Sequence, residues 1–167
     1  SNEILVIILK GHLYIENALL ELLSEIIDLE LVNSDMSFKQ KLDLAYSLGL
    51  ILDETYRPLN KFNKIRNQYM HKINYCFNEK EFNDLLSTFS KEYKDTFYKI
   101  SKQGGHNELK TNFLTNTVML IYEMWSNILI HKVLAIESVN TKLNGKQFGI
   151  LCDYVAKEGG TKSAIQE

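Results

Sequence analysis

Apolar residues recur at steps of three and four along most of this chain, which is the spacing that places side chains on one face of an α-helix. The alternation of apolar and polar residues that is typical of β-strands is not sustained. The first predicted helix is apolar over more than half of its circumference, so we expect neighbouring helices to cover it on several sides. The pattern predicts an all-α protein, an antiparallel bundle of about five helices. These helices are predicted at residues 3–31, 37–49, 58–75, 78–100 and 108–137, the third starting near either 53 or 58.

Short polar motifs mark where these helices begin and end. Ser37 and Gln40 have the spacing of a capping box, in which two side chains bond backbone N–H groups of the first turn, and Asn78 and Glu81 repeat that spacing. Pro58 has no backbone N–H, so the third helix is expected either to start near it or to kink there. Turns are predicted at Gly49 and at Gly104-Gly105.

The 167 residues are enough for one domain that buries its own core without disulfides or metals. We expect this domain to be a helical bundle over residues 3–137. The helical signal weakens after Ser138, and residues 138–167 are predicted to form a partly ordered C-terminal extension. Within it, residues 142–157 are compatible with a short helix or an irregular segment, and a mobile tail is expected from Gly159-Gly160 onward.

Charge and cysteine content narrow the classes of function. With 19 Lys and Arg against 21 Asp and Glu, the formal net charge is −2, so any contact with nucleic acid requires a local basic patch. The two Cys are too few for a disulfide framework and have no metal-type spacing with the four His. We therefore expect a cytoplasmic protein without cofactor or metal. The apolar run at residues 4–9 is too short to span a membrane, so no membrane association is expected.

The third predicted helix carries a local basic patch, because residues 57–72 hold five Lys and Arg and no acidic residue. At about 100° per residue, Asn67 and His71 fall one turn apart on the side opposite an apolar stripe, and Arg66 lies near the edge of that stripe. Asn is a poor helix former, so repeated Asn on this side indicates a surface that contacts something. The apolar stripe consists of Leu59, Phe62, Ile65, Tyr69, Ile73 and Cys76, and the polar side of Asn60, Asn67, His71 and Asn74.

Residues 59–71, preceded by an apolar helix and by a segment from Phe38-x-x-Lys41 to Leu48-Gly49, resemble the HEPN superfamily. Members of that family are small all-helical domains, and many are metal-independent RNases of toxin–antitoxin, phage-defence and stress systems. Their signature is an Arg, usually followed by a polar residue, and then a His after a short spacer. Arg66, Asn67 and His71 match this signature, and the resemblance implies that they are catalytic. It also implies an RNA substrate, a homodimer with a composite cleft, and a protein antitoxin or regulator as a partner.

These residue types suit RNA cleavage, because RNA supplies its own nucleophile in the 2′-hydroxyl. A cleaving enzyme then needs a proton acceptor, a proton donor and positive charge beside the phosphate. We expect His71 to serve as general acid or base and Arg66 to hold the phosphate oxygens through two N–H groups. Asn67 would orient the phosphate or the imidazole. Three nearby lysines, Lys61, Lys64 and Lys72, are expected to bind the RNA backbone without reading sequence.

Other interpretations of the same residues stay open at this point. Arg66 could pair with a Glu of the first helix, and His71 could be a solvated or interface imidazole. His12 and Glu16 are one turn apart and could support a site, although a hydrogen-bonded pair within the first helix is favoured. The alternative function is a non-catalytic binding or regulatory module, such as a transcriptional regulator that resembles the mannitol-operon repressor or a domain that binds RNA or protein.

Overall fold

The computed structural model describes residues 2–27, 36–103 and 109–162. Over these residues the chain forms six helices and no strand, which confirms the all-α expectation with one helix more than predicted. The helices are α1 (Asn2–Ser24), α2 (Phe38–Ser47), α3 (Asp53–His71), α4 (Glu79–Leu86), α5 (Lys91–Gln103) and α6 (Leu109–Lys162).

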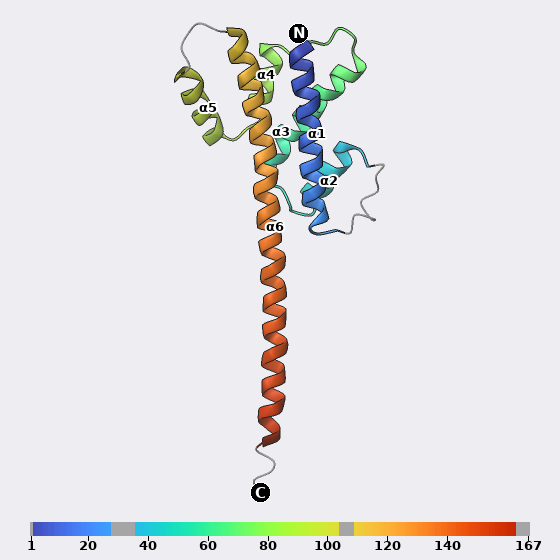
Figure 1. Ribbon diagram of the computed structural model, residues 1–167, viewed down its shortest axis with the longest axis vertical. Coiled ribbons are helices and arrows are strands. Elements are labelled where there is room, and N and C mark those ends of the chain that lie inside the picture. The colour runs from blue at the N-terminus through green and yellow to red at the C-terminus, as the bar shows by residue number, and fades with distance from the viewer. Residues whose placement is uncertain (1, 28–35, 104–108, 163–167) are drawn as a thin grey trace. The chain divides into compact units, whose positions relative to one another are not determined.

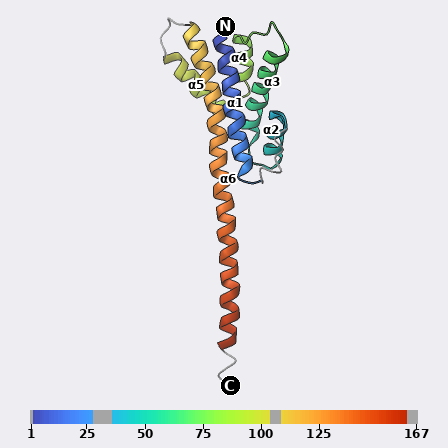
Figure 2. The ribbon, with the colours of Figure 1, turned by 45° about the vertical axis from the view of Figure 1, so that its right-hand side comes forward.

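The chain divides into two compact units, Ser1–Lys132 and Val133–Glu167. The first unit is a helical bundle, with α1 beside the first part of α6 (Figure 1). Turning the view places α2 and α3 on the other side of α1 (Figure 2). This central position explains why α1 is apolar over most of its circumference, since it has neighbours on two sides. Its buried side chains include Ile4, Ile8, Ile15, Leu19, Leu22 and Leu23.

The start of α2 follows the predicted capping box. Ser37 Oγ accepts a hydrogen bond from the backbone N–H of Gln40, and Gln40 Oε1 accepts one from the backbone N–H of Ser37. The helix ends at Ser47, and Gly49 follows with a φ of 70°. Only glycine adopts this left-handed conformation without strain, so the turn predicted at Gly49 is confirmed.

The start of α3 agrees with one of the two predicted starts, and its end corrects an expectation. The helix starts at Asp53 with Pro58 inside it, so the carbonyl of Glu54 lacks its usual backbone donor four residues later. It ends at His71 rather than near Tyr75, because Lys72 adopts an extended conformation with φ −124° and ψ 109°. The helical periodicity therefore stops short of Ile73, which is 102% exposed instead of buried. Cys76, also predicted for the apolar stripe, is exposed as well.

The single helix predicted at residues 78–100 is wrong, since the structure has α4 and α5 with a break between them. Hydroxyl groups at the break bond to the backbone: Ser87 Oγ donates to the Asp84 carbonyl at 2.8 Å and Thr88 Oγ1 to the Leu85 carbonyl at 2.6 Å. Ser90 Oγ accepts from the backbone N–H of Tyr93 at 3.2 Å and so caps α5. Such bonds compete with helix continuation. At the start of α4, Asn78 Oδ1 accepts hydrogen bonds from the backbone N–H groups of Lys80 and Glu81, which confirms the cap. The second half of the predicted capping box, a bond from the Asn78 N–H to the Glu81 side chain, is absent among the described residues.

The last helix is much longer than predicted, because α6 continues from Leu109 to Lys162. The C-terminal extension is therefore helical as far as Lys162, including Gly159-Gly160, where a mobile tail was expected. The first helix is shorter than predicted, because α1 ends at Ser24 and residues 25–27 form a turn and a bend. The turn predicted at Gly104-Gly105 lies outside the described residues. Within the described part of the chain, one segment, Phe113–Lys142, is long and apolar enough to cross a membrane. Core helices of soluble proteins meet the same criterion.

Candidate functional site

Arg66 and Asn67 line a polar pocket of about 300 Å³ in the first unit. They come from the C-terminal part of α3, where Arg66 Nη1 donates a hydrogen bond to Asn67 Oδ1 at 3.1 Å. The other walls are one side of α1 and the first turn of α2. We call this the α1–α2–α3 pocket, and its lining residues are His12, Glu16, Ser37, Phe38, Lys39, Asn63, Arg66 and Asn67.

His71 does not line this pocket, although the sequence predicted that it would act with Arg66 and Asn67. It is the last residue of α3 and is exposed. It is four positions after Asn67, so it lies about one turn further along and about 40° around the helix. The structure thus brings two members of the predicted motif together and places the third just beyond them, on almost the same side of α3 as Asn67.

The three lysines predicted to bind RNA lie in different surroundings. Lys64 and Lys72 are exposed on α3 and at its end. Lys61 points toward α4, where its Nζ is 3.6 Å from Asp84 Oδ2. Two of the three lysines are therefore open to solvent near the motif, and the third is engaged in an ion pair.

The pocket also contains His12, which is only 3% exposed. Its Nε2 lies 3.2 Å from Asn63 Oδ1, and its Nδ1 lies 3.8 Å from Glu16 Oε2. Its ring centroid is 4.4 Å from that of Phe38. Burial lowers the pKa of His12, because a desolvated imidazolium is unfavourable. The charges of Arg66 and Lys41 act in the same direction, whereas the Asn63 hydrogen bond and the Glu16 carboxylate oppose it.

Ion pairs neutralise most charges around the pocket. Lys41 is buried, and its Nζ lies 2.8 Å from Glu16 Oε1. Lys39 is bonded to Asp43 and to the hydroxyl of Tyr56, which is 2.7 Å from its Nζ. Among the described residues, Arg66 forms no ion pair with Glu16 or any other carboxylate, contrary to the alternative in which it pairs with the first helix. Its guanidinium is therefore the cation of this pocket that is available to an anionic ligand.

The long-range contact of His12 was not predicted from the sequence. The spacing of His12 and Glu16 was visible, but the favoured interpretation was a pair within one helix. The structure shows instead that the hydrogen bond of His12 runs to Asn63 on α3, 51 positions away. Asn63 sits at the edge of the polar side of α3, so its contact depends on how α1 packs there. A partner across two helices leaves no local signal in the sequence.

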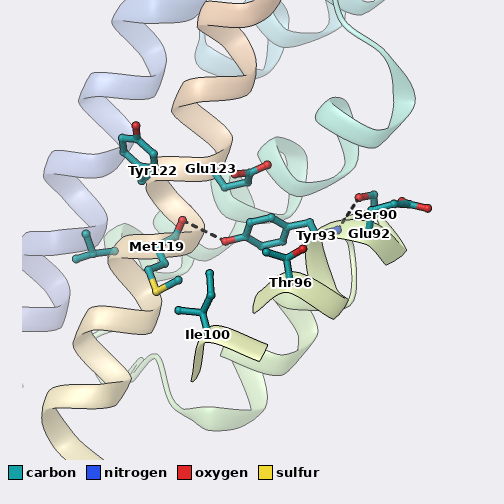
Figure 3. Close-up of a pocket in the computed structure, with 9 residues that line it drawn as sticks. Ser90, Glu92, Tyr93, Thr96, Ile100, Met119, Tyr122 and Glu123 are labelled. Carbon is teal, nitrogen blue, oxygen red and sulfur yellow. Dashed lines mark hydrogen bonds between the residues drawn. The ribbon is translucent and has the colours of Figure 1, made fainter. Parts of the chain in front are cut away.

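A larger groove lies elsewhere in the first unit, between α5 and α6, with a volume of about 610 Å³. Figure 3 shows Tyr93 of α5 reaching toward α6, where its hydroxyl donates to the Met119 carbonyl at 3.3 Å. Burial raises the pKa of Tyr93, and the nearby Glu123 carboxylate adds to this effect. The lining is mostly apolar, and it shares Val118 and Tyr122 with a smaller groove between α1 and α6. This larger groove lacks the cation and imidazole found in the α1–α2–α3 pocket.

The α1–α2–α3 pocket offers a guanidinium, amide groups and an imidazole, which suit a phosphate and a proton transfer. Among the described residues, no group of three or more His, Cys, Asp or Glu is placed to hold a metal ion. No protein family, curated protein or solved structure matches this chain. The chemistry of the site is therefore inferred from its residues.

Proposed function

We propose that this protein is a metal-independent endoribonuclease of the HEPN type. The observation that carries the proposal is the state of Arg66, a cation without an ion pair among the described residues, in a pocket that also holds Asn67. A guanidinium in this position can bind two oxygens of an RNA phosphate and stabilise the extra charge of the transition state. His71, exposed one turn beyond Asn67, supplies an imidazole as general acid or base.

The position of His71 also supports a homodimer. Its side chain lies outside the pocket of its own chain, and Met70 and Ile73 beside it are exposed apolar residues. A second copy that covers this end of α3 would bring two His71 side chains and two Arg66 side chains to one cleft. Lys64 and Lys72 would then contact the RNA backbone on either side. We place this activity in toxin–antitoxin, phage-defence or stress response, under the control of a protein antitoxin or regulator.

The test is cleavage of a labelled single-stranded RNA by purified protein with a chelator present. Cleavage through the 2′-hydroxyl leaves a 2′,3′-cyclic phosphate and a 5′-hydroxyl, which mass spectrometry distinguishes from the products of metal-dependent hydrolysis. We expect Arg66→Ala and His71→Ala each to reduce the rate by about 10²- to 10⁴-fold. Gln68→Ala, on the same helix but outside the pocket, is the matched control and should cleave normally. Undiminished cleavage by His71→Ala would disprove this mechanism.

A non-catalytic module that binds RNA, protein or a nucleotide is the second candidate. One observation favours it: His71 does not line the pocket that contains Arg66. Such a module would retard the same RNA in a gel shift, with Arg66→Ala weakening the complex, and would leave the RNA intact. A transcriptional regulator like the mannitol-operon repressor belongs to this class.

A further inference from the structure

The hydrogen bond between His12 and Asn63 fixes which nitrogen of the imidazole carries the proton. The Oδ1 atom of Asn63 can only accept, so Nε2 of His12 must donate, at 3.2 Å. In the neutral ring the lone pair is then on Nδ1. Among the described residues Nδ1 has no hydrogen bond, and it is not one of the fully buried side-chain atoms without a partner, which are Asn60 Oδ1, the Tyr75 hydroxyl and Glu81 Oε2. The nearest carboxylate oxygen, Glu16 Oε2, is 3.8 Å away.

The groups around Nδ1 of His12 favour a role in proton transfer over a purely structural one. His12 lines the pocket together with Arg66, a cation that can hold a phosphate, and with Glu16, whose carboxylate lies 3.8 Å from Nδ1. If Nδ1 gains a proton, the Glu16 carboxylate stabilises the imidazolium that forms. Lys41, paired with that carboxylate at 2.8 Å, limits this effect, so the ring stays neutral until a proton is delivered.

We propose that His12 is the general base of this site and that Nδ1 takes the proton of the 2′-hydroxyl of an RNA whose phosphate is held by Arg66. This inference depends on the proposed nuclease function and extends it with a second histidine. The O–H bond breaks, its proton moves to Nδ1, and the oxygen forms a bond to phosphorus. The bond from phosphorus to the 5′-oxygen breaks, and His71, brought to this cleft by the proposed dimer, donates a proton to that oxygen. Asn63 acts as a positioning residue, because it sets the tautomer.

The first experiment detects the ligand without requiring cleavage. The protein is labelled with ¹⁵N-histidine, and NMR follows the ring signals of His12 as the pH is changed. The titration is done without ligand, with inorganic phosphate and with adenosine 3′-monophosphate. Bound phosphate favours the imidazolium, so the pKa of His12 should rise with either ligand, and more with the nucleotide if the pocket takes RNA. His131 is the internal control, since it is partly buried and bonded to Thr55 outside the pocket. A pKa of His12 that is unchanged by both ligands would overturn the inference.

The second experiment measures proton transfer. The amide of His12→Gln can still donate to Asn63 but cannot take a proton, so the cleavage rate should fall by about 10²- to 10⁴-fold with little change in KM. The wild-type rate should decline at low pH as His12 becomes protonated. The charges that face His12 are Glu16 on its own helix, Lys41 on α2 and Arg66 on α3. Glu16→Gln should therefore shift this decline to lower pH.

The outcomes separate the two proposals. If wild type and His12→Gln cleave equally while Arg66→Ala does not, the nuclease stands and His12 is structural. If wild type cleaves no RNA, the nuclease and the role of His12 as a base both fail, and the phosphate titration still shows whether His12 faces a bound anion. If circular dichroism shows that His12→Gln is unfolded, the Glu16→Gln variant serves as the test instead. An unchanged pH profile of the cleavage rate in Glu16→Gln would contradict the inference.

Discussion

Gly11 of α1 lies so close to Ile121 of α6 that a β-carbon at position 11 would stand 2.7 Å from Ile121 Cγ2 and 2.9 Å from Cδ1. Alanine stabilises a helix by about 1 kcal/mol relative to glycine. However, Cγ2 is attached directly to a branched β-carbon and cannot move without a change of rotamer. We expect Gly11→Ala to cost about 1–3 kcal/mol through overpacking and to be destabilising on balance, as measured by urea unfolding.

A double-mutant cycle with Ile121 tests whether overpacking against this side chain causes the loss of stability in Gly11→Ala. Ile121→Ala removes both atoms that the new methyl group would meet. In that background Gly11→Ala should become stabilising, by up to about 1 kcal/mol, because only the helix propensity remains. If Gly11→Ala changed the free energy of unfolding in the same direction in both backgrounds, the contact between α1 and α6 would not be the reason for glycine at position 11.

Asn63→Ala is predicted to destabilise the fold by about 1–3 kcal/mol, because it leaves the buried N–H of His12 without its acceptor. Asn67→Ala is the matched control on the same helix. Asn67 is less buried and its side-chain bond is to Arg66, so its loss should cost no more than about 0.5 kcal/mol. Thermal unfolding of both variants by circular dichroism provides the comparison. Equal stabilities of the Asn63→Ala and Asn67→Ala variants would mean that the hydrogen bond between His12 and Asn63 contributes nothing to the stability of the fold.

Local signals in the sequence predicted much of the fold. The capping box at Ser37, the cap at Asn78 and the turn at Gly49 each depend on a few neighbouring residues, and the structure contains all three. The break between α4 and α5 escaped prediction although it is local. Apolar spacing continues across it, while the hydroxyl groups of Ser87 and Thr88 divert the backbone.

The site was only partly predictable because its contacts join separate helices. Helical geometry placed Asn67 on the polar side of α3 and Arg66 near its edge, which is compatible with the pocket. It could not place His12 against Asn63, since that contact depends on the packing of α1 on α3. The role of His71 stays a prediction, because the geometry of a single chain does not show which residues would surround it in the proposed dimer.

Two substitutions around the pocket should move the pKa of His12 in opposite directions. Lys41→Met removes a positive charge and leaves Glu16 unpaired, so the pKa of His12 should rise. Glu16→Gln removes the negative charge beside Nδ1, so the pKa should fall below its already lowered value. NMR titration of the histidine ring measures both. Shifts in the same direction would show that the charges of these two residues do not control the imidazole.

Stability should decrease as the pH falls below the ordinary histidine pKa of about 6.5. Burial lowers the pKa of both His12 and His131 in the folded protein. Between about pH 6.5 and the lower folded values, the unfolded chain binds more protons than the folded chain, so protonation favours unfolding there. The stabilising contribution of the neutral rings is fully present above about pH 6.5 and is lost progressively below it.

Urea unfolding between pH 7.5 and pH 5 measures this dependence. His12→Gln and His131→Gln should each flatten part of the curve, and the double variant should flatten most of it. Asp43 does not interfere, because its bonds to Lys39 and Tyr56 lower its pKa from an ordinary value near 3.8, so its stabilising effect is lost only in more acidic solution. If His12→Gln alone left the slope unchanged, the imidazole would be taking up protons as readily in the folded protein as in the unfolded chain. The neutral, proton-accepting state inferred for His12 would then be excluded.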